Sequence, residues 1–519
     1  MGERRAVRAV SVIDIGSNFV RMGVYQARRT GDGDQRVRRI DFLEVPLRLG
    51  HEVFAAGRIS LQTMRRLSAI LRGFSQVMKE YGVTEYRAIA TTAVREAQNR
   101  AYVIDQLRIQ NGLVIEVLED GEESALVYSA LCSSPLLREE TLLSYVGTGC
   151  VGLAVWRAGV IDQSYTLTQG FLKLSERLRA GEEATPRFYR MLEEYIQTYF
   201  YRMELRLGGQ RFSRVLLAGR QLETIASLCG ARPEKGAFVV ERAQLEKIYT
   251  RLKETNPALL ARDMDITEEM AEQIAPMLAI YRRIMDVVGA KKLVAPPVNL
   301  MEVLAAQLLL PAQRTAFENA QREGAIASSR RFAEQEGADI THAERVRTAC
   351  VVLFGKLKKL HGISGKRLVL LECAALLHEV GYRANVRDAS QGAYDLIRQS
   401  CLYGLSDEET RLVAEIIRKS ERPSARDGRE ELSEKQRLLV DKLAAIMGLA
   451  DALDTTRQGR AADVKARLEE QRLVVTVSGR GELLLEKWTF QDRAAFFEEA
   501  FGVQPVLVHK STLFKEAGQ

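Results

Sequence analysis

The sequence contains few cysteines and no long apolar run, and each absence excludes a class of protein. Its 6 cysteines lie far apart among 519 residues. Because they show no paired spacing, they form neither a zinc ribbon nor a disulfide framework, which predicts a reducing compartment. No stretch reaches the ~18 uninterrupted apolar residues of a bilayer span, since even the run 368–377 contains Glu372. The arginine-rich start is followed by an apolar segment that Asp14 interrupts, so we expect a cytoplasmic protein with no secretory signal and no membrane partner.

The composition is that of a folded protein with several domains. A hydrophobic fraction of 46% and a charged fraction of 28% exclude disordered, collagenous and coiled-coil classes. The length of 519 residues exceeds three times the ~150 residues typical of one domain. The net charge of +7 arises from 75 basic and 68 acidic residues. No motif that reads a nucleic-acid groove accompanies this charge, so we expect no nucleic-acid partner.

Periodicity divides the chain into two α/β halves, a helical region and a small α/β tail. In the first half we expect a helix at 61–81, a turn at 31–34, and strands at 10–15, 20–26, 36–45, 86–91 and 114–118. Strands expected at 142–146 and 152–157 surround a second glycine-bearing turn and indicate an internal duplication. After residue 230 the pattern becomes almost wholly helical, and the tail predicts strands at 473–477 and 483–487 before a helix at 494–501.

The first turn and two later segments carry residues that bind phosphate. Asp14, Gly16, Ser17 and Asn18 follow a strand, so backbone N–H groups can approach an anion and the carboxylate can hold a metal. The same turn is also typical of an ordinary hairpin. Thr91 and Thr92 lie at the end of an expected strand, with Arg95 one turn into a helix. Hydroxyls, a helix N-terminus and a guanidinium together predict a phosphate site.

Two carboxylates follow the next expected strand. Glu122 and Glu123 open a helix, where a side chain can face the same cleft as Asp14. Carboxylates beside a phosphate site are candidates for a general base and for a metal ligand. An ordinary solvated glutamate at a helix start is the alternative.

Residues 14–22, 90–99 and 122–128 resemble, in order and spacing, three signature segments of the exopolyphosphatase and guanosine pentaphosphate phosphohydrolase (Ppx/GppA) family. The resemblance implies duplicated actin-like (ribonuclease H-like) domains at 1–124 and 125–312. It further implies a helical HD-like domain at 313–458 and a small α/β subdomain at 459–519. Such proteins release the terminal phosphate of polyphosphate or guanosine pentaphosphate with Mg²⁺, and they pair as dimers.

The resemblance also assigns roles to residues. It implies that Glu123 is the general base and that Asp14 is a ligand of Mg²⁺. The positions implied to contact phosphate are Gly16, Ser17, Asn18, Thr92, Arg95, Gly147, Thr148 and Gly149.

The second half of the expected cleft departs from the family pattern. Where the family has a second carboxylate near the metal, this chain has Tyr145, and where the family has a phosphate-binding hydroxyl it has Cys150. Gly152 stands in place of a glutamate, and Met301 stands in place of an arginine. Losing a hard oxygen ligand weakens Mg²⁺ binding. Two hypotheses follow. The chain is either a hydrolase that uses glutamate-activated water and a divalent metal, or a catalytically weak binder of polyphosphate or guanosine polyphosphates that acts as a sensor or regulator.

The helical region contains part of the metal-binding pattern of HD hydrolases. His342, His378 and Asp451 fill three ligand places, but Glu379 replaces the paired aspartate. The chain has 5 histidines in all, and on an apolar helix His378 favours a structural role over metal ligation. We expect no catalysis there.

Basic residues gather in the same region. Between His342 and Glu372 there are two acids, Glu344 and Glu372 itself, and the basic residues are Arg345, Arg347, Lys356, Lys358, Lys359, Lys366 and Arg367. Such a helix face can hold a polyphosphate chain through counterion release. An ordinary solvated helix face is the alternative.

Overall fold

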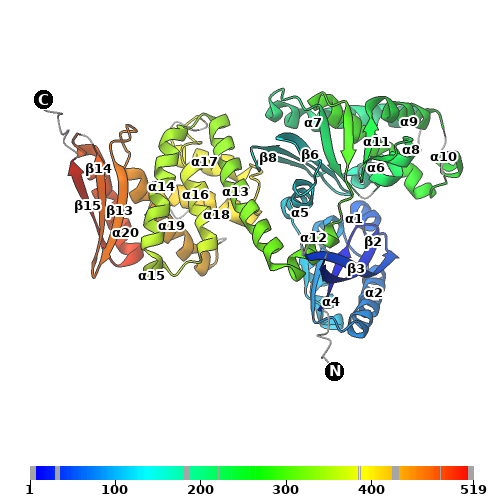
Figure 1. Cartoon of the computed structure of the whole chain (residues 1–519), viewed down its shortest axis with the longest axis horizontal. Helices are drawn as coiled ribbons and strands as arrows, with labels where there is room; N and C mark the ends of the chain where they lie inside the picture. The colour runs from blue at the N-terminus through cyan, green and yellow to red at the C-terminus, as the bar shows by residue number, and fades with distance from the viewer. Residues whose placement is uncertain are drawn as a thin grey trace. The chain divides into compact units, whose positions relative to one another are not determined.

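The computed structural model describes residues 8–29, 35–179, 186–219, 221–234, 236–255, 257–263, 265–383, 385, 387–423, 432–479 and 481–511. The turn expected at 31–34 lies outside these ranges. Contacts divide the chain into unit 1, residues 1–321, and unit 2, residues 322–519 (Figure 1). The finer division into four domains remains a prediction.

Apolar alternation near the N-terminus produces a five-stranded sheet in unit 1. Its order is β3-β2-β1-β4-β5, in which β2 runs antiparallel to β1 and β3, while β4 and β5 run parallel to β1. The strands are β1 (Ala9–Ile15), β2 (Phe19–Arg29), β3 (Gln35–Pro46), β4 (Glu85–Ala90) and β5 (Ile115–Val117). All five strands expected in this half are therefore confirmed.

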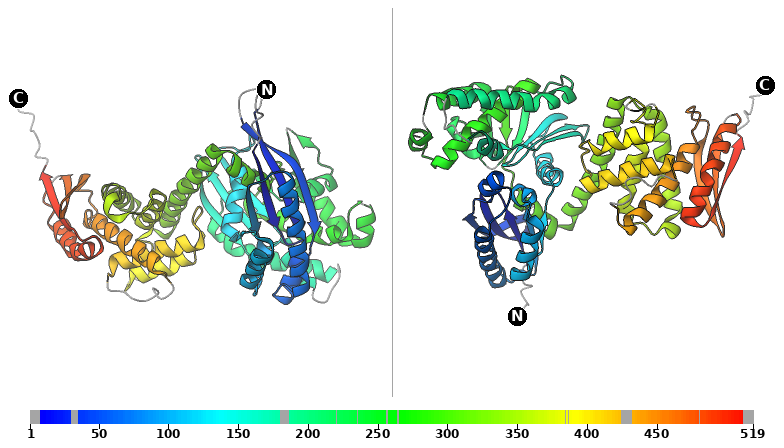
Figure 2. Two further views of the ribbon diagram at one scale, coloured as in Figure 1. Left: turned by 90° about the horizontal axis from the view of Figure 1, so that it is seen from below. Right: turned by 180° about the vertical axis from the view of Figure 1, so that it is seen from behind.

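Helices cover both faces of this sheet (Figure 2). Ile13 and Ile15 pack against α2 (Leu61–Glu80) and α4 (Arg100–Asn111). Val10 and Val12 face the other way, toward α5 (Asp120–Cys132) and α12 (Leu300–Leu309). This alternation follows the period of two along a strand. Short helices α1 (Leu49–Ala56) and α3 (Thr92–Glu96) complete this half.

The second sheet repeats the topology of the first. Its order is β8-β7-β6-β9-β12-β11-β10, and in its first five strands β7 is antiparallel to both neighbours while β9 and β12 run parallel to β6. The strands are β6 (Glu140–Val146), β7 (Val151–Arg157), β8 (Val160–Leu167), β9 (Arg214–Ala218), β10 (Pro233–Glu234), β11 (Ala237–Glu241) and β12 (Lys292–Ala295). The internal duplication is confirmed. The expectation of an almost wholly helical chain after residue 230 was wrong for β10, β11 and β12, which are short strands.

The helices of the second half bury a large apolar cluster against this sheet. Leu192 and Phe200 of α7, Leu245 of α9 and Leu278 of α11 meet Leu153 of β7 within it. The helices are α6 (Phe171–Arg179), α7 (Pro186–Leu207), α8 (Leu222–Leu228), α9 (Arg242–Glu254), α10 (Pro257–Asp263) and α11 (Glu268–Val288).

Unit 2 is helical up to residue 452, as expected. Helix α13 (Pro311–Glu336) crosses the boundary between the units in the sequence. The next helices are α14 (Ile340–Lys356), α15 (Lys358–His361), α16 (Leu368–Leu377), α17 (Ala389–Arg398), α18 (Asp407–Glu421) and α19 (Glu434–Ala452). Ser406 and Ser433 form capping boxes at the starts of α18 and α19, which satisfies N–H groups that a helix start leaves unpaired.

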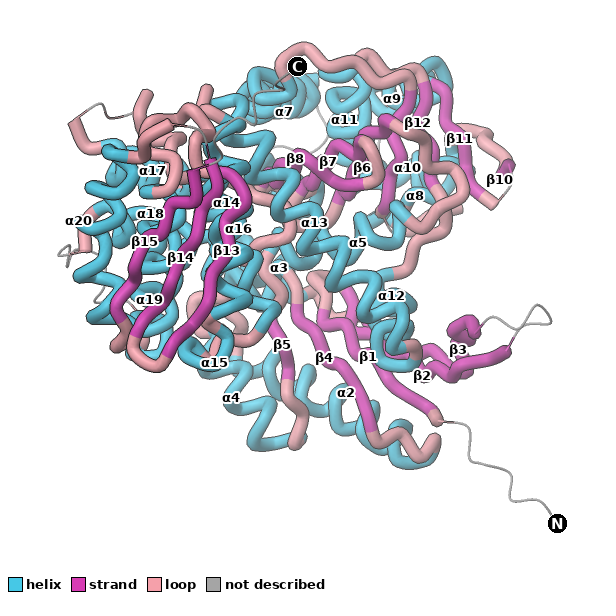
Figure 3. Tube along the Cα trace, turned by 60° about the vertical axis from the view of Figure 1, so that its left-hand side comes forward, coloured by secondary structure: helices cyan, strands magenta, loops and turns pink. Residues whose placement is uncertain are grey.

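The tail is a three-stranded sheet with one helix on it (Figure 3). It consists of β13 (Ala462–Glu469), β14 (Arg472–Gly479), β15 (Gln504–Ser511) and α20 (Leu484–Phe501). The strand expected at 483–487 was wrong, because this segment begins α20. Leu483, Phe490 and Phe497 are buried at a spacing of seven, which is helical. Strand β13 escaped prediction because its faces are largely exposed and show no clear alternation.

No helix in the described ranges is both long enough and apolar enough to cross a membrane.

Candidate functional site

The two glycine-bearing turns of unit 1 meet at the ends of their sheets. The Gly16 N–H donates to the Phe19 carbonyl over 3.0 Å, which tightens the first turn. The Ser17 hydroxyl lies 3.0 Å from the Thr148 hydroxyl of the second turn. Asn18 holds the next segment through its carbonyl, which accepts from the Leu47 N–H over 3.0 Å. The structure therefore brings together turns that are separated by 131 positions in the chain.

The second turn depends on having no side chain at Gly149. A Cβ there would lie 1.9 Å from Thr92 Cγ2. Gly147 and Thr148 are held from the other side, since their carbonyls accept from the Phe171 and Leu172 N–H groups over 3.2 and 3.1 Å. Thr92 and the second turn are thus in direct contact.

Arg95 occupies the centre of this region. It is 7% exposed, and it donates to the Thr92 hydroxyl over 3.0 Å, to the Leu118 carbonyl and to Asp120. Burial lowers the pKa of Arg95, but Glu123 and Asp120 outweigh it and raise the pKa. Sequence reasoning missed Asp120, although its position in the first turn of α5, beside Glu123, was the available signal.

The two carboxylate oxygens of Glu123 differ in their hydrogen bonding. The Tyr145 hydroxyl donates to Oε1 over 2.7 Å. Oε2 is buried without a hydrogen-bond partner among the described residues and lies 3.6 Å from an Arg95 nitrogen. Burial raises the pKa of Glu123, although Arg95 and Tyr145 oppose it. Burial and Glu123 raise the pKa of Tyr145 well above its usual range, so the phenol is a neutral donor.

The Asp14 carboxylate is engaged in an ion pair instead of being available to a metal. Strand register places it opposite Arg21, and the Arg21 guanidinium donates to Asp14 Oδ2 over 2.8 Å. Arg21 also donates to Glu44 over 2.6 Å. A cross-strand ion pair therefore balances the charge of Asp14. The neutral Tyr145 supplies no second anionic oxygen, so the expected Mg²⁺ site at Asp14 and its partner position does not fit the donors present.

A second acidic group fits a divalent metal better. Ligand atoms of Asp120, Glu123 and Cys150 lie within 4.8 Å of one another. Mg²⁺ commonly takes one or two carboxylates and completes its shell with water and substrate phosphate. Cys150 contributes little, because burial raises the pKa of its thiol well above the usual range. Arg95 already contacts both carboxylates, so a metal there would compete with it.

The remaining departures from the family pattern serve packing. A Cβ at Gly152 would lie 2.3 Å from the Tyr128 hydroxyl, which fills that space. Met301 is 3% exposed and packs with Val10 and Val12 under the first sheet. Neither position presents a charged group to the cluster around Glu123.

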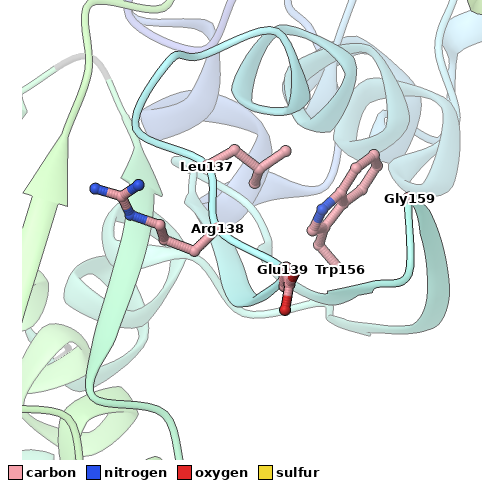
Figure 4. Close-up of a pocket in the computed structure, with 5 residues that line it drawn as sticks. All are labelled: Leu137, Arg138, Glu139, Trp156 and Gly159. Atoms are coloured by element: carbon pink, nitrogen blue, oxygen red, sulfur yellow. The ribbon is translucent and has the colours of Figure 1, made fainter.

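A surface pocket of unit 1 lies away from this cluster. It is lined by Leu137, Arg138, Glu139, Trp156 and Gly159 (Figure 4). Glu139 precedes β6, whereas Tyr145 lies near its other end, about 20 Å away at the rise of a strand. The pocket is therefore separate from the candidate site.

Unit 2 brings together the three residues that the HD-like pattern singles out. His342 Nε2 lies 3.2 Å from His378 Nε2 and 3.1 Å from Asp451 Oδ1. Glu379, in the place of the paired aspartate, instead binds Arg457 and accepts from the Asp339 N–H over 3.2 Å. Burial lowers the pKa of His342, but hydrogen bonds with Asp451 and Asp454 raise it to about 9.

The basic residues of this region fall into two groups. Arg345 pairs with Asp454, Arg347 with Glu344 and Glu372, and Arg367 with Glu409. The lysines around the end of α14 lie exposed, namely Lys356, Lys358 and Lys359. Only the lysine group retains the character expected of a polyanion-binding face.

Comparison with known proteins identifies the family. The sequence model of the Ppx/GppA phosphatase family matches residues 34–309, and that of domain III of Ppx/GppA phosphatase matches residues 326–488. The curated Exopolyphosphatase 1 of Mycobacterium tuberculosis and that of Mycobacterium bovis are each 29% identical over 122 residues, 24% of this chain and 34% of theirs. The match thus spans about a third of the length of these relatives.

Solved structures share the fold. The Ppx/GppA family member of Aquifex aeolicus aligns at 20% identity and a TM-score of 0.50, over 59% of this chain and 99% of that one. An exopolyphosphatase from Cytophaga hutchinsonii aligns at 16% identity and a TM-score of 0.52, over 58% of this chain and 98% of that one. These likenesses support the duplicated actin-like fold. Because the first family model alone covers more than half of the sequence, the chain belongs to the Ppx/GppA phosphatase family.

Proposed function

We propose that the chain is a phosphoanhydride hydrolase that releases terminal phosphate from inorganic polyphosphate or guanosine pentaphosphate. The observation that carries the proposal is the state of Glu123. Its Oε1 is fixed by Tyr145, while its Oε2 is buried, lacks a hydrogen bond among the described residues and lies beside Arg95. A carboxylate held in this way is suited to take a proton from water.

The electrostatics of the cluster agree with this role. A general base works best with a pKa near the operating pH, and burial raises the pKa of Glu123 in that direction. Arg95, the Thr92 hydroxyl and the N–H groups of the two turns are donors for the transferring phosphate, where preorganised donors stabilise developing charge. Phosphate would take over Arg95 contacts that Asp120 now occupies.

The proposals for the metal, the cellular location and the oligomeric state rest on the family. The donors at Asp14 do not support a metal site. Mg²⁺ would be held by Asp120 together with phosphate oxygens and water, and it would neutralise substrate charge while Glu123 stays available as the base. We further propose that the chain works in the cytoplasm and pairs as a dimer, which light scattering coupled to size exclusion would test.

Phosphate release from long-chain polyphosphate with Mg²⁺ tests the function. Glu123→Gln should lower the turnover rate about 10²- to 10⁴-fold, the usual contribution of a general base. Glu122→Gln is the matched control, because Glu122 accepts from the Glu119 N–H over 3.0 Å and glutamine can replace it in a capping box. Equal rates of phosphate release by wild type and Glu123→Gln would refute the proposed hydrolase function.

The competing hypothesis of a weak binder gains support from the Asp14–Arg21 ion pair and from the uncharged Tyr145. The same assay separates the two functions. Saturable binding of polyphosphate by the wild type with no phosphate release above that of Glu123→Gln would favour a sensor or regulator.

A further inference from the structure

Three side chains converge in unit 2 from the ends of three helices. His342 lies in the first turn of α14, His378 is the C-cap of α16, and Asp451 lies in the last turn of α19. His342 and His378 are 2% and 5% exposed. Their Nε2 atoms and Asp451 Oδ1 form a triangle with sides of 3.2, 3.1 and 3.5 Å.

The contact of Nδ1 in each imidazole determines whether Nε2 of the same ring can accept a hydrogen bond or bind a metal. His342 Nδ1 faces Asp454 Oδ2 at 2.9 Å, and His378 Nδ1 faces the Ala375 carbonyl at 2.8 Å. Carboxylate and carbonyl oxygens only accept, so both Nδ1 atoms carry the proton. When the rings are neutral, as in a metal complex, both Nε2 atoms therefore direct lone pairs at each other and at Asp451 Oδ1. Three acceptors at this distance need a positive charge between them, which is either a proton on one Nε2 or a bound metal ion.

The triangle has the dimensions of a metal site. Tetrahedral bonds of ~2.0–2.1 Å place neighbouring ligand atoms roughly 3.3 Å apart, which is close to the observed 3.1–3.5 Å. A carboxylate and a backbone carbonyl that hold the far nitrogens of two imidazoles are also the usual outer partners of metal-bound histidines.

Among the residues that the structure describes, the surroundings of the triangle offer three protein ligands. Glu379 is held by Arg457 and by the Asp339 N–H, so it does not reach inward as a fourth ligand. Asp454 is held by His342, by Arg345 and by the Gly459 N–H over 2.8 Å. The Asp451 side chain is 35% exposed, which leaves an approach from solvent on its side.

We propose that His342 Nε2, His378 Nε2 and Asp451 Oδ1 bind a single divalent transition-metal ion, with at least one coordination position open to solvent. Two imidazoles and one carboxylate favour Zn²⁺ and its first-row neighbours over Mg²⁺ and Ca²⁺, which prefer all-oxygen shells. The ion would join α14, α16 and α19, so it would stabilise unit 2 whether or not it has a chemical role.

The test is a titration of the full-length, metal-free chain with Zn²⁺, and with Co²⁺ as a spectroscopic probe. Wild type should bind one equivalent of Zn²⁺ at this site. The affinity of Asp451→Asn for that equivalent should be at least 100-fold weaker. The group at Asp120, Glu123 and Cys150 is present in both proteins, so the difference reports only the site in unit 2. His51→Gln is the histidine control, because His51 is exposed in unit 1.

Two further measurements keep the test decisive. Zn²⁺ should raise the Tm of the wild type and of His51→Gln, but not that of Asp451→Asn, whose metal-free Tm and circular dichroism check that it folds. Asp454→Asn acts through His342 and should weaken binding 10- to 100-fold. Equal Zn²⁺ affinity in wild type, Asp451→Asn and His378→Gln would overturn the proposal, as would a wild type that shows no Co²⁺ d–d absorption.

Discussion

Replacing Tyr145 with phenylalanine removes one hydroxyl from the candidate base and leaves the rest of the cluster in place. That hydroxyl donates to Glu123 Oε1 over 2.7 Å, and it lowers the pKa of a carboxyl that burial raises. A hydrogen bond to a charged group contributes ~1.5–3 kcal/mol. Its loss favours the protonated glutamate, which corresponds to a roughly 10- to 150-fold smaller ionised fraction on the acid side of the profile.

The assay is phosphate release from polyphosphate as a function of pH. We expect the acid limb of the profile of Tyr145→Phe to move to higher pH. Activity should fall most at low pH and should recover toward the wild-type plateau at alkaline pH, where Glu123 is ionised in both proteins.

Tyr189→Phe is the matched control. Tyr189 is 5% exposed and its hydroxyl donates to the Leu252 carbonyl over 2.8 Å, so its loss removes a comparable bond without touching Glu123. An unmoved acid limb in Tyr145→Phe would refute the assigned role of the phenol. A uniform rise in activity at every pH would refute it too, because Tyr145 would then block the base instead of orienting it.

Two further predictions concern packing and charge. Gly149→Ala should lower the free energy of unfolding by ~1–3 kcal/mol, because its Cβ would collide with Thr92; Gly73→Ala, with open space in α2, should raise it by ~0.5–1 kcal/mol. Urea unfolding measures both, and equal stability of the two variants would contradict the packing at Gly149. Replacing the exposed lysines with alanine should flatten the dependence of polyphosphate affinity on salt by about 0.7 in log–log slope for each lysine–phosphate ion pair that the substitution removes, and an unchanged slope would identify an ordinary solvated face. The triple variant changes Lys356, Lys358 and Lys359.

The sequence predicted the architecture where its periodicity was strong. The strands of the first half followed from alternation and turns, and the structure shows that the second half repeats their order. The tail was harder, because the apolar residues at 483–487 were interpreted as a strand, whereas they begin α20. The burial of Leu483, Phe490 and Phe497 at a spacing of seven shows the helical face that the strand prediction overlooked.

The members of the site remain a prediction from the sequence, whereas the contacts of those residues come from the structure. Ser17 lies beside Thr148 and Thr92 beside Arg95, since the ends of strands in two related sheets bring their turns together. The sequence alone did not indicate that Arg21 neutralises Asp14 or that Asp120 binds Arg95. The first follows from the register of a hairpin, and the second from the first turn of a helix. Both depend on distances that only the folded chain defines.

Hydrolysis in ¹⁸O-labelled water tests most directly whether water, activated by Glu123, attacks the terminal phosphorus of a phosphoanhydride. We expect one ¹⁸O atom in each orthophosphate released by the wild type, and about 10²-fold or more slower release by Glu123→Gln. Unlabelled orthophosphate from the wild type, or labelled orthophosphate released equally fast by Glu123→Gln, would contradict this role of Glu123.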